Sequence, residues 1–342
     1  MPLYDRRQTL ALLAGIAAAP ALGEDASPVV LKHLRMISAI SAGSTADRIL
    51  RAMSSAAQRA LPAAQVDTEN GTGSLRTLAD VIAAGPDPAI AAMIGGSILY
   101  DILQDTADAA TRFNTVNFIG AIGRDHEALF ATKQSGFTSI DDLRAATVPL
   151  FVPVASVKAA TYTNAQLVNA MTGLRLQTVA GYAPAERKIA LLSGETNVAI
   201  AAIDSFADLV EQGALVPLMR FRDIPYGPPY DNLPALPSLA KGPDAPVLLE
   251  LMAAVMGSDR IVVSQPSLST GEIAAMRQLF ATIVADPQFG TESGLGTRIG
   301  ASDHGALEAS VGKVLAARDA IAPVLARALA CGVALGTGGT CS

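Results

Sequence analysis

Three short segments rich in glycine, serine and threonine could bind a small anion. They are residues 41–45, 71–74 and 95–97, and each follows a stretch with the pattern of a buried strand. Such loops expose backbone N–H groups, and a helix that begins there adds the positive end of its dipole. Glycine and serine also make ordinary tight turns. Three such loops in succession nevertheless favour a site for a carboxylate or a phosphate.

The sequence patterns of the common enzyme classes are absent. There is no Gly-x-Ser-x-Gly elbow and no phosphate-binding P-loop, and the glycines after Asn70 lack the third glycine of a dinucleotide fingerprint. The three histidines are scattered, and none has a second histidine four residues on, so we expect no metal and no cofactor. His126 or Tyr182 could still act as a general acid or base, which leaves an exported enzyme as an alternative.

These loops are separated by alternating strand and helix patterns. Short apolar runs at residues 34–40, 66–70 and 89–94 indicate strands, and helical apolar spacing appears at 47–61 and 75–84. This alternation predicts an α/β fold with a parallel sheet covered by helices. In such a sheet, the loops that follow the carboxyl ends of the strands form the ligand crevice.

The same alternation continues through the middle of the chain. Strands are predicted at 127–133, 148–154, 198–203 and 216–221, and helices at 139–145, 161–171 and 186–192. A proline-rich break at 225–237 follows. Helices are then predicted at 269–285 and 302–330, the second interrupted by Pro323.

Length and charge exclude several classes of protein. A chain of 342 residues predicts about two domains. Its net charge of -6 disfavours a general nucleic-acid binder, because such proteins present a basic surface. Aromatic residues make up only 4% and tryptophan is absent, so a stacking platform for single strands is not expected.

Residues 1–23 resemble a secretory signal peptide. Arg6 and Arg7 form a positive start, residues 10–19 are apolar, and 21–23 are small-x-small, which leaves Glu24 as the first mature residue. Both the general secretory route and the twin-arginine route fit this pattern. The apolar segment is short for an uncleaved anchor, so we expect cleavage and a periplasmic protein. In that oxidising compartment Cys331 and Cys341 are expected to form a structural disulfide.

The order of several short motifs resembles the solute receptors of tripartite tricarboxylate transporters, the Bug or TctC family. The resemblance extends from about residue 34 to 330. The similar segments are residues 41–50, 69–73, 113–116, 139–143, 192–197, 232–236 and 285–287. Two departures stand out: the first loop lacks the family's proline and one glycine, and Lys158 stands where the family has a glycine.

The resemblance implies a two-lobe periplasmic-binding-protein fold of type II-like topology, each lobe a sheet flanked by helices, with the ligand cleft at the hinge. Lobe 1 would comprise residues 24–126 plus 221–342, and lobe 2 residues 127–220. The implied function is capture of a small organic carboxylate and its delivery to a membrane transporter or to a sensor ectodomain. The protein would act as a monomer and bind no nucleic acid.

The candidate ligand-binding residues come from both lobes. In lobe 1 they are Ser41, Gly43, Ser44, Thr45, Gly71, Thr72, Gly73 and Ser97, and in lobe 2 they are Ser156, Lys158, Thr161, Tyr182 and Asp204. Asp47 is interpreted as a helix cap, since an anion would repel it. Lys158 could meet a distal carboxylate or be a solvated loop lysine. Tyr182 could donate its hydroxyl or pack in the interlobe wall, and Asp204 suits an amino or hydroxyl group. An exported sensor or orphan binding protein without a transporter is a further alternative.

Overall fold

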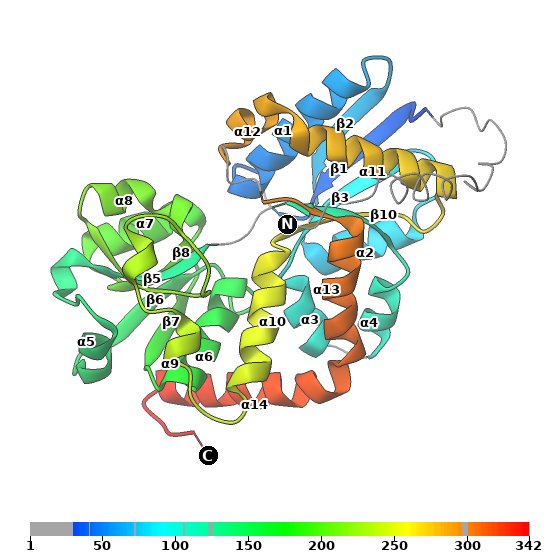
Figure 1. The fold of residues 1–342 in the computed structure, drawn as a ribbon. Helices are drawn as coiled ribbons and strands as arrows, with labels where there is room; N and C mark the ends of the chain where they lie inside the picture. The colour runs from blue at the N-terminus through cyan, green and yellow to red at the C-terminus, as the bar shows by residue number, and fades with distance from the viewer. Residues whose placement is uncertain are drawn as a thin grey trace, which may run out of the picture.

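The computed structural model describes residues 30–40, 42–71, 73–104, 107–122, 126–295 and 300–341. The predicted signal peptide, Ser41 and Thr72 lie outside these ranges. Two groups of strands lie side by side, each with its own helices, and one long helix runs beneath both (Figure 1). We call the group built on the larger sheet lobe 1 and the other lobe 2.

Lobe 1 contains a six-stranded sheet with the order β11-β4-β10-β3-β1-β2. The strands β1, β2 and β3 are parallel, as the sequence predicts, but β10 runs antiparallel to both of its neighbours. β10 enters the sheet from a distant part of the chain, so no local pattern could reveal its direction. The strand bounds are β1 His33–Ser38, β2 Gln65–Asn70, β3 Ala89–Gly95, β4 Asn117–Ile122, β10 Arg260–Ser264 and β11 Ser302–Asp303.

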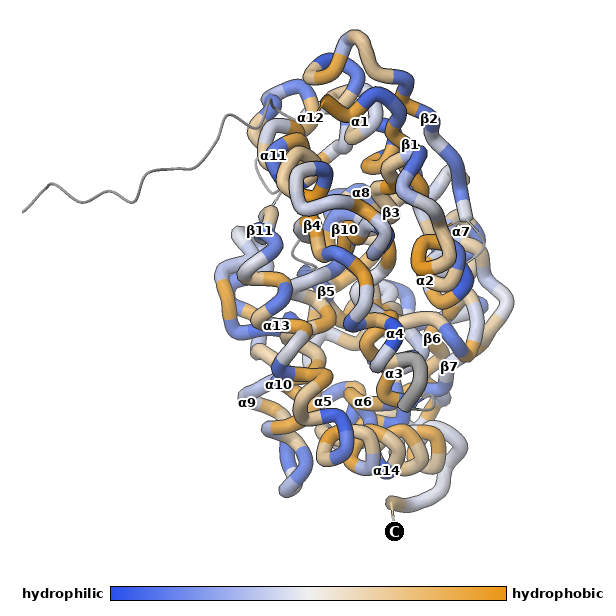
Figure 2. Tube along the Cα trace, turned by 90° about the vertical axis from the view of Figure 1, so that its right-hand side faces the viewer, coloured by the Kyte–Doolittle hydropathy of each residue, from blue (hydrophilic) through white to orange (hydrophobic). Residues whose placement is uncertain are grey.

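Helices cover both faces of this sheet. In β1, Leu34 and Met36 pack into one apolar cluster with α1 and α11, whereas Ile37 packs into another with α2, α3 and α10. A strand buried on both faces reads as a continuous apolar run, and Figure 2 shows hydrophobic residues along β3, β4 and β10. The helices are α1 Thr45–Ala60, α2 Ser74–Ala83, α3 Ile98–Gln104, α4 Ala107–Phe113, α10 Ala245–Gly257, α11 Thr270–Ala285, α12 Pro287–Ser293 and α13 His304–Ala316.

Lobe 2 has two sets of hydrogen-bonded strands. The strands β8, β5 and β9 form an antiparallel set, and β6 and β7 form a parallel pair. Asn197, just before β8, joins the sets by accepting a 2.8 Å hydrogen bond from the Phe151 amide of β6. The bounds are β5 Glu127–Thr132, β6 Leu150–Val154, β7 Leu176–Ala180, β8 Val198–Ala202, β9 Leu215–Arg220, α5 Ile140–Ala145, α6 Ala160–Thr172, α7 Pro184–Ser193, α8 Ala207–Glu211 and α9 Leu236–Leu239.

The last helix, α14 (Arg318–Gly336), packs against helices of both lobes (Figure 1). One apolar cluster accordingly includes Leu103 of α3, Leu167 of α6, Leu251 of α10 and Leu325 of α14. By length and composition alone, α14 could also cross a membrane.

The predicted helical segment 302–330 is divided differently from the prediction. The break falls at Ala317, and Pro323 lies inside α14. Proline removes one backbone hydrogen bond from a helix interior. The helix continues because its packing on both lobes outweighs that single loss.

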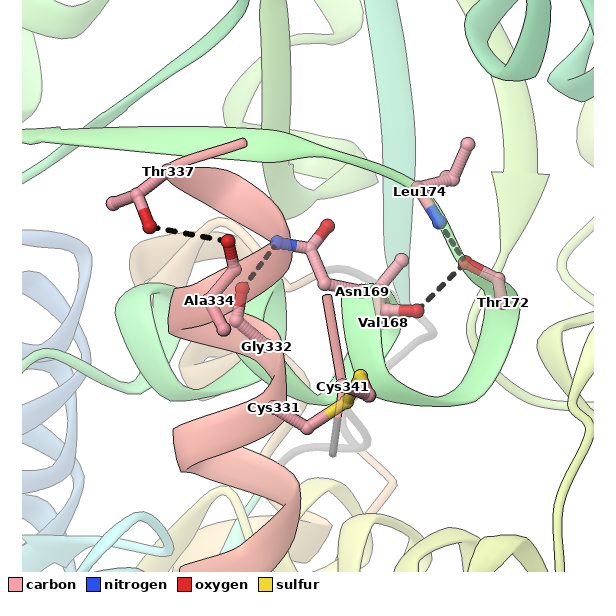
Figure 3. Close-up of a disulfide and its surroundings, with 9 residues drawn as sticks. All are labelled: Val168, Asn169, Thr172, Leu174, Cys331, Gly332, Ala334, Thr337 and Cys341. Atoms are coloured by element: carbon pink, nitrogen blue, oxygen red, sulfur yellow. Dashed lines mark hydrogen bonds between the residues drawn. A yellow bond between two sulfur atoms is a disulfide. The ribbon is translucent and has the colours of Figure 1, made fainter. Parts of the chain in front are cut away.

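Two glycines let α14 approach lobe 2 closely. A Cβ atom on Gly332 would lie 2.1 Å from the Gln166 carbonyl oxygen, and one on Gly336 would lie 2.6 Å from the Leu176 carbonyl oxygen. The fully buried Asn169 uses this proximity, because its Nδ2 donates to the carbonyls of Leu176 (2.9 Å) and Gly332 (3.1 Å). Figure 3 shows the bond from Asn169 to the Gly332 carbonyl beside the disulfide between Cys331 and Cys341, which ties the C-terminal tail to α14.

We expect Gly332→Ala to lower the free energy of unfolding by about 3 kcal/mol, because the new methyl group must displace the backbone of α6. Gly312→Ala is the matched control. Gly312 lies in α13 with no atom within 4 Å of an added Cβ, so alanine there should stabilise by about 0.5–1 kcal/mol through helix propensity. Urea unfolding of both variants measures the difference. Equal effects would contradict the close packing.

Candidate functional site

The loops after β1, β2 and β3 lie at one edge of the sheet, as predicted. Ser38 at the end of β1 pairs with Asn70 of β2 and with Met93 of β3, so the three strands finish side by side. The helices α1, α2 and α3 begin directly after these loops. The carboxyl edge of the parallel strands therefore gathers three helix starts in one place.

The first loop is held from inside by Asp47. This carboxylate, 6% exposed, accepts hydrogen bonds from the Gly43 amide (2.9 Å) and from Asn70 Nδ2 (3.0 Å). Asn70 also donates to the Ile40 carbonyl at 3.1 Å, which fastens the first loop to the end of β2. The prediction that Asp47 caps α1 is wrong in detail, because the N-cap is Ser44, whose hydroxyl accepts from the Asp47 amide at 3.1 Å.

Asp47 is a structural anion rather than a free charge. Burial by itself would raise the pKa of Asp47, but hydrogen bonds from Gly43, Asn70 and the Arg51 guanidinium outweigh burial and lower it. The carboxylate is therefore ionised at neutral pH and already surrounded by donors. A ligand anion would find no unsatisfied acid at this end of α1.

The predicted glycine donors of the first two loops serve the loops themselves. The Gly43 amide donates a hydrogen bond to Asp47, and the Gly71 amide donates one to the Ser38 carbonyl at 2.6 Å. A Cβ atom on Gly71 would lie 2.5 Å from Thr77 Oγ1, so a larger residue there would force the Thr77 side chain to move. These two residues shape the site, and a ligand requires other donors.

Hydroxyl groups gather around Gly95 at the end of β3. A Cβ atom on Gly95 would lie 3.4 Å from Ser97 Oγ, 3.9 Å from Ser74 Oγ and 4.0 Å from Ile40 Cδ1. Neither serine hydroxyl bonds to a residue within the described ranges, and both residues are only partly buried. Ser74 was not among the predicted residues. Its position at the start of α2, after Gly73, was the signal that could have identified it.

Helix α2 also begins without a side-chain cap. Its N-cap is Gly73, with a φ of 117°, and no side chain of a described residue accepts a hydrogen bond from its first turn. The orphan amides at a helix start are an anion-binding group when no side chain satisfies them. The start of α2 therefore offers backbone N–H donors for an anion, in addition to the Ser74 and Ser97 hydroxyls near Gly95.

Lobe 2 repeats this arrangement at the carboxyl ends of β6 and β7. Val154 pairs with Ala180, and its carbonyl accepts from the amides of Gly181 (3.1 Å) and Tyr182 (3.2 Å). Helix α6 follows with Ala159 at its N-cap and no side-chain cap. A second uncapped helix start thus comes from lobe 2.

The predicted lobe 2 residues differ in their availability. Ser156 and Lys158 are exposed, Thr161 is half-buried, and Lys158 makes no ion pair with a described residue. The hydroxyl of Tyr182 is committed, since it donates to Glu195 Oε1 at 2.6 Å, and this bond raises the pKa of Tyr182. Asp204 is exposed in the short turn after β8.

The two lobes meet behind these loops through buried polar side chains. The Tyr100 hydroxyl of α3 donates to Asn164 Oδ1 of α6 at 2.9 Å, and Asn164 Nδ2 donates to Glu127 Oε2 of β5 at 2.6 Å. Burial raises the pKa of Glu127 to about 7, against the opposing effect of the Asn164 bond. None of these three residues was predicted from the sequence, although a glutamate at the start of the apolar strand 127–132 was a visible signal.

The described residues hold no group of three or more His, Cys, Asp or Glu side chains that could bind a metal. A pocket of about 400 Å³ lies beside the first loop, between α1 and α12, lined by Ser44, Thr45, Arg48, Arg51 and Glu292 among others. Its two arginines are already engaged, Arg48 with the Ser293 carbonyl and Arg51 with Asp47.

Comparisons with solved structures identify the class of fold. No protein-family model matches the sequence, and no curated protein matches it. The chain has the two-lobe fold of a periplasmic binding protein. The structure of the periplasmic binding protein BugD is similar with a TM-score of 0.65 at 15% identity, covering 87% of this chain and 97% of that one.

Two ligand-bound structures from Rhodopseudomonas palustris are also similar. Rpa4515 with adipate has a TM-score of 0.62 at 16% identity and covers 86% of this chain and 97% of its own. MatC with bound malate has a TM-score of 0.59 at 15% identity and covers 85% and 98%. At these identities the likeness establishes the fold, and the ligands are those of the neighbours.

The raised pKa of Glu127 predicts how stability depends on pH. The folded protein keeps a proton that the unfolded chain releases between its ordinary pKa of 4.5 and about 7, so the free energy of unfolding falls as pH rises through this window. Across this window the free energy of unfolding decreases by about 3 kcal/mol. Glu127→Gln keeps an acceptor for Asn164 and removes the charge, so it should abolish this part of the decline. Urea unfolding from pH 5 to 8 tests this, and parallel curves for the two proteins would refute it.

Proposed function

We propose that this chain is an extracytoplasmic solute-binding protein that captures a small organic carboxylate between its lobes. The observation that carries the proposal is the Tyr100–Asn164 hydrogen bond. It holds the start of α3 in lobe 1 close to the start of α6 in lobe 2. The uncapped starts of α2 and α6 supply amide donors on the two sides. Hydroxyl groups of Ser74, Ser97 and Thr161 complete a set of neutral donors suited to a carboxylate.

Lys158 supplies the positive charge in this proposal. It is exposed next to the start of α6 and pairs with no described acid, so its ammonium group can meet a ligand carboxylate. Asp47 is already neutralised by its own partners and does not oppose an anion. Asp204, in the short turn after β8, suits a hydroxyl or amino group of the ligand.

The wider biological role follows from the same interpretation. The proposal includes membership of the Bug and TctC family, export by the leader at residues 1–23, and delivery of the ligand to a tripartite tricarboxylate-type transporter. The adipate and malate bound by two structural neighbours support the ligand class. Ligand that touches both lobes shifts the population to the closed arrangement, which the membrane partner would recognise.

A thermal-melting screen of the mature protein against mono-, di- and tricarboxylates tests the proposal. A ligand at about 100 times its Kd adds about 2.7 kcal/mol and raises the Tm by several degrees. Lys158→Ala should weaken binding roughly tenfold or more, because it removes a charge-assisted contact. Lys241→Ala is the matched control, since Lys241 is an exposed lysine far along the chain from these loops.

A carboxylate that raises Tm in the wild type and in Lys241→Ala, but much less in Lys158→Ala, supports the site. Recovery of the bound compound unchanged after incubation distinguishes a receptor from an enzyme that uses His126. If no acid raises the Tm, the carboxylate assignment is wrong.

A further inference from the structure

We propose that Tyr100, Asn164 and Glu127 form a latch that fixes the separation of the two sides of the ligand site and releases a proton when the lobes part. The latch itself rests on contacts in the structure, whereas its effect on ligand binding rests on the proposed function. The three residues come from α3, α6 and β5, so the latch joins lobe 1 to lobe 2.

Two residues of the latch follow candidate ligand-binding residues by three positions in the chain. Tyr100 is three residues after Ser97, and its amide donates to the Ser97 carbonyl at 2.9 Å. Asn164 is likewise three residues after Thr161, and residues three apart lie on the same face of a helix. The bond between Tyr100 and Asn164 therefore sets the distance between a lobe 1 helix start and a lobe 2 helix start.

The bonds of the latch run in one direction, from Tyr100 to Glu127. The Tyr100 hydroxyl donates to Asn164 Oδ1, and Asn164 Nδ2 donates to Glu127 Oε2. A carboxyl group that carries a proton still keeps an oxygen that can accept this bond. The side chains of Tyr100 and Asn164 are 2% exposed and Glu127 is 7% exposed, so water cannot replace a lost partner in this arrangement.

Parting of the lobes would break one bond of the latch and leave the other. Tyr100 belongs to lobe 1, whereas Asn164 and Glu127 both belong to lobe 2, and the backbone carbonyl of Glu127 also accepts from Tyr226 OH at 3.0 Å. When Tyr100 withdraws, the Asn164 oxygen and then the Glu127 carboxylate become accessible to water. The environment of Glu127 consequently differs between the latched and the separated arrangements.

The charged groups around Glu127 determine the direction of the pH effect. Burial raises the pKa of Glu127 to about 7, the Asn164 bond and Arg187 act to lower it, and Asp259 acts to raise it. The pKa values of Tyr100 and Tyr226 are also raised by burial, so both remain protonated donors. Hydration on separation lowers the pKa of Glu127 toward its ordinary value, and the proton leaves. Acid therefore favours the latched arrangement and alkali the separated one.

Distances between spin labels test the latch without any ligand. Labels are placed at Asp80→Cys on α2 and Asp141→Cys on α5, whose side chains are 60% and 86% exposed. No free cysteine competes for the label, because both native cysteines are in the disulfide. From pH 5.5 to 8.5, the wild-type distance distribution should shift to longer values and broaden.

Three variants of the labelled protein separate the latch from other causes. Tyr100→Phe removes the interlobe donor and should give the broad distribution at both pH values. Glu127→Gln stays neutral and should keep the narrow distribution at both. Tyr162→Phe is the matched control and should behave as wild type, because the Tyr162 hydroxyl bonds to no described residue.

A wild-type distribution that does not change with pH, or a Tyr100→Phe distribution identical to wild type, overturns the latch. These results do not depend on the ligand. Failure of the carboxylate screen together with a normal pH response would therefore reject the proposed function and leave the latch in place.

Discussion

The hydrogen bond between Tyr100 and Asn164 is the constraint on which the geometry of the candidate site depends. Both groups are buried, so each needs the other: an unpaired hydroxyl or amide in such a place costs about 1–3 kcal/mol. This mutual requirement fixes how lobe 1 approaches lobe 2. Because both residues lie one turn inside helices that begin at the site, satisfying the buried bond also positions the exposed donors.

The loops in front of this bond are shaped by a second set of internal bonds. Asp47 accepts hydrogen bonds from Gly43 and Asn70, and the Gly71 amide donates to the Ser38 carbonyl. These bonds order the loops of lobe 1 before any ligand binds. Binding to a preorganised site loses less conformational entropy than binding to loops that must first order. The groups left for a ligand are then the uncapped helix starts and hydroxyls, which favour an anion without fixing its length.

Local signals predicted the elements and the edge at which the loops meet, because turns, caps and apolar periods are encoded over a few residues. The helix predicted at 139–145, which is α5, and the loops after β1, β2 and β3 illustrate this. Contacts between distant segments were not predictable in this way. The antiparallel entry of β10, the continuation of α14 through Pro323, and the Tyr182–Glu195 bond all depend on tertiary partners. The sequence around Asn164 indicates only a helix, because its hydrogen bonds depend on Tyr100 and Glu127, which are distant in the chain.

The close packing of α14 against lobe 2 at Gly332 and Gly336 has a mechanical consequence. Helix backbones that approach this closely, with Asn169 bonded into both α14 and β7, cannot slide past one another without breaking buried bonds. Helix α14 therefore moves with lobe 2 as one body. Because α14 also packs against α3 and α10 of lobe 1, a rotation between the lobes has to be accommodated at those contacts.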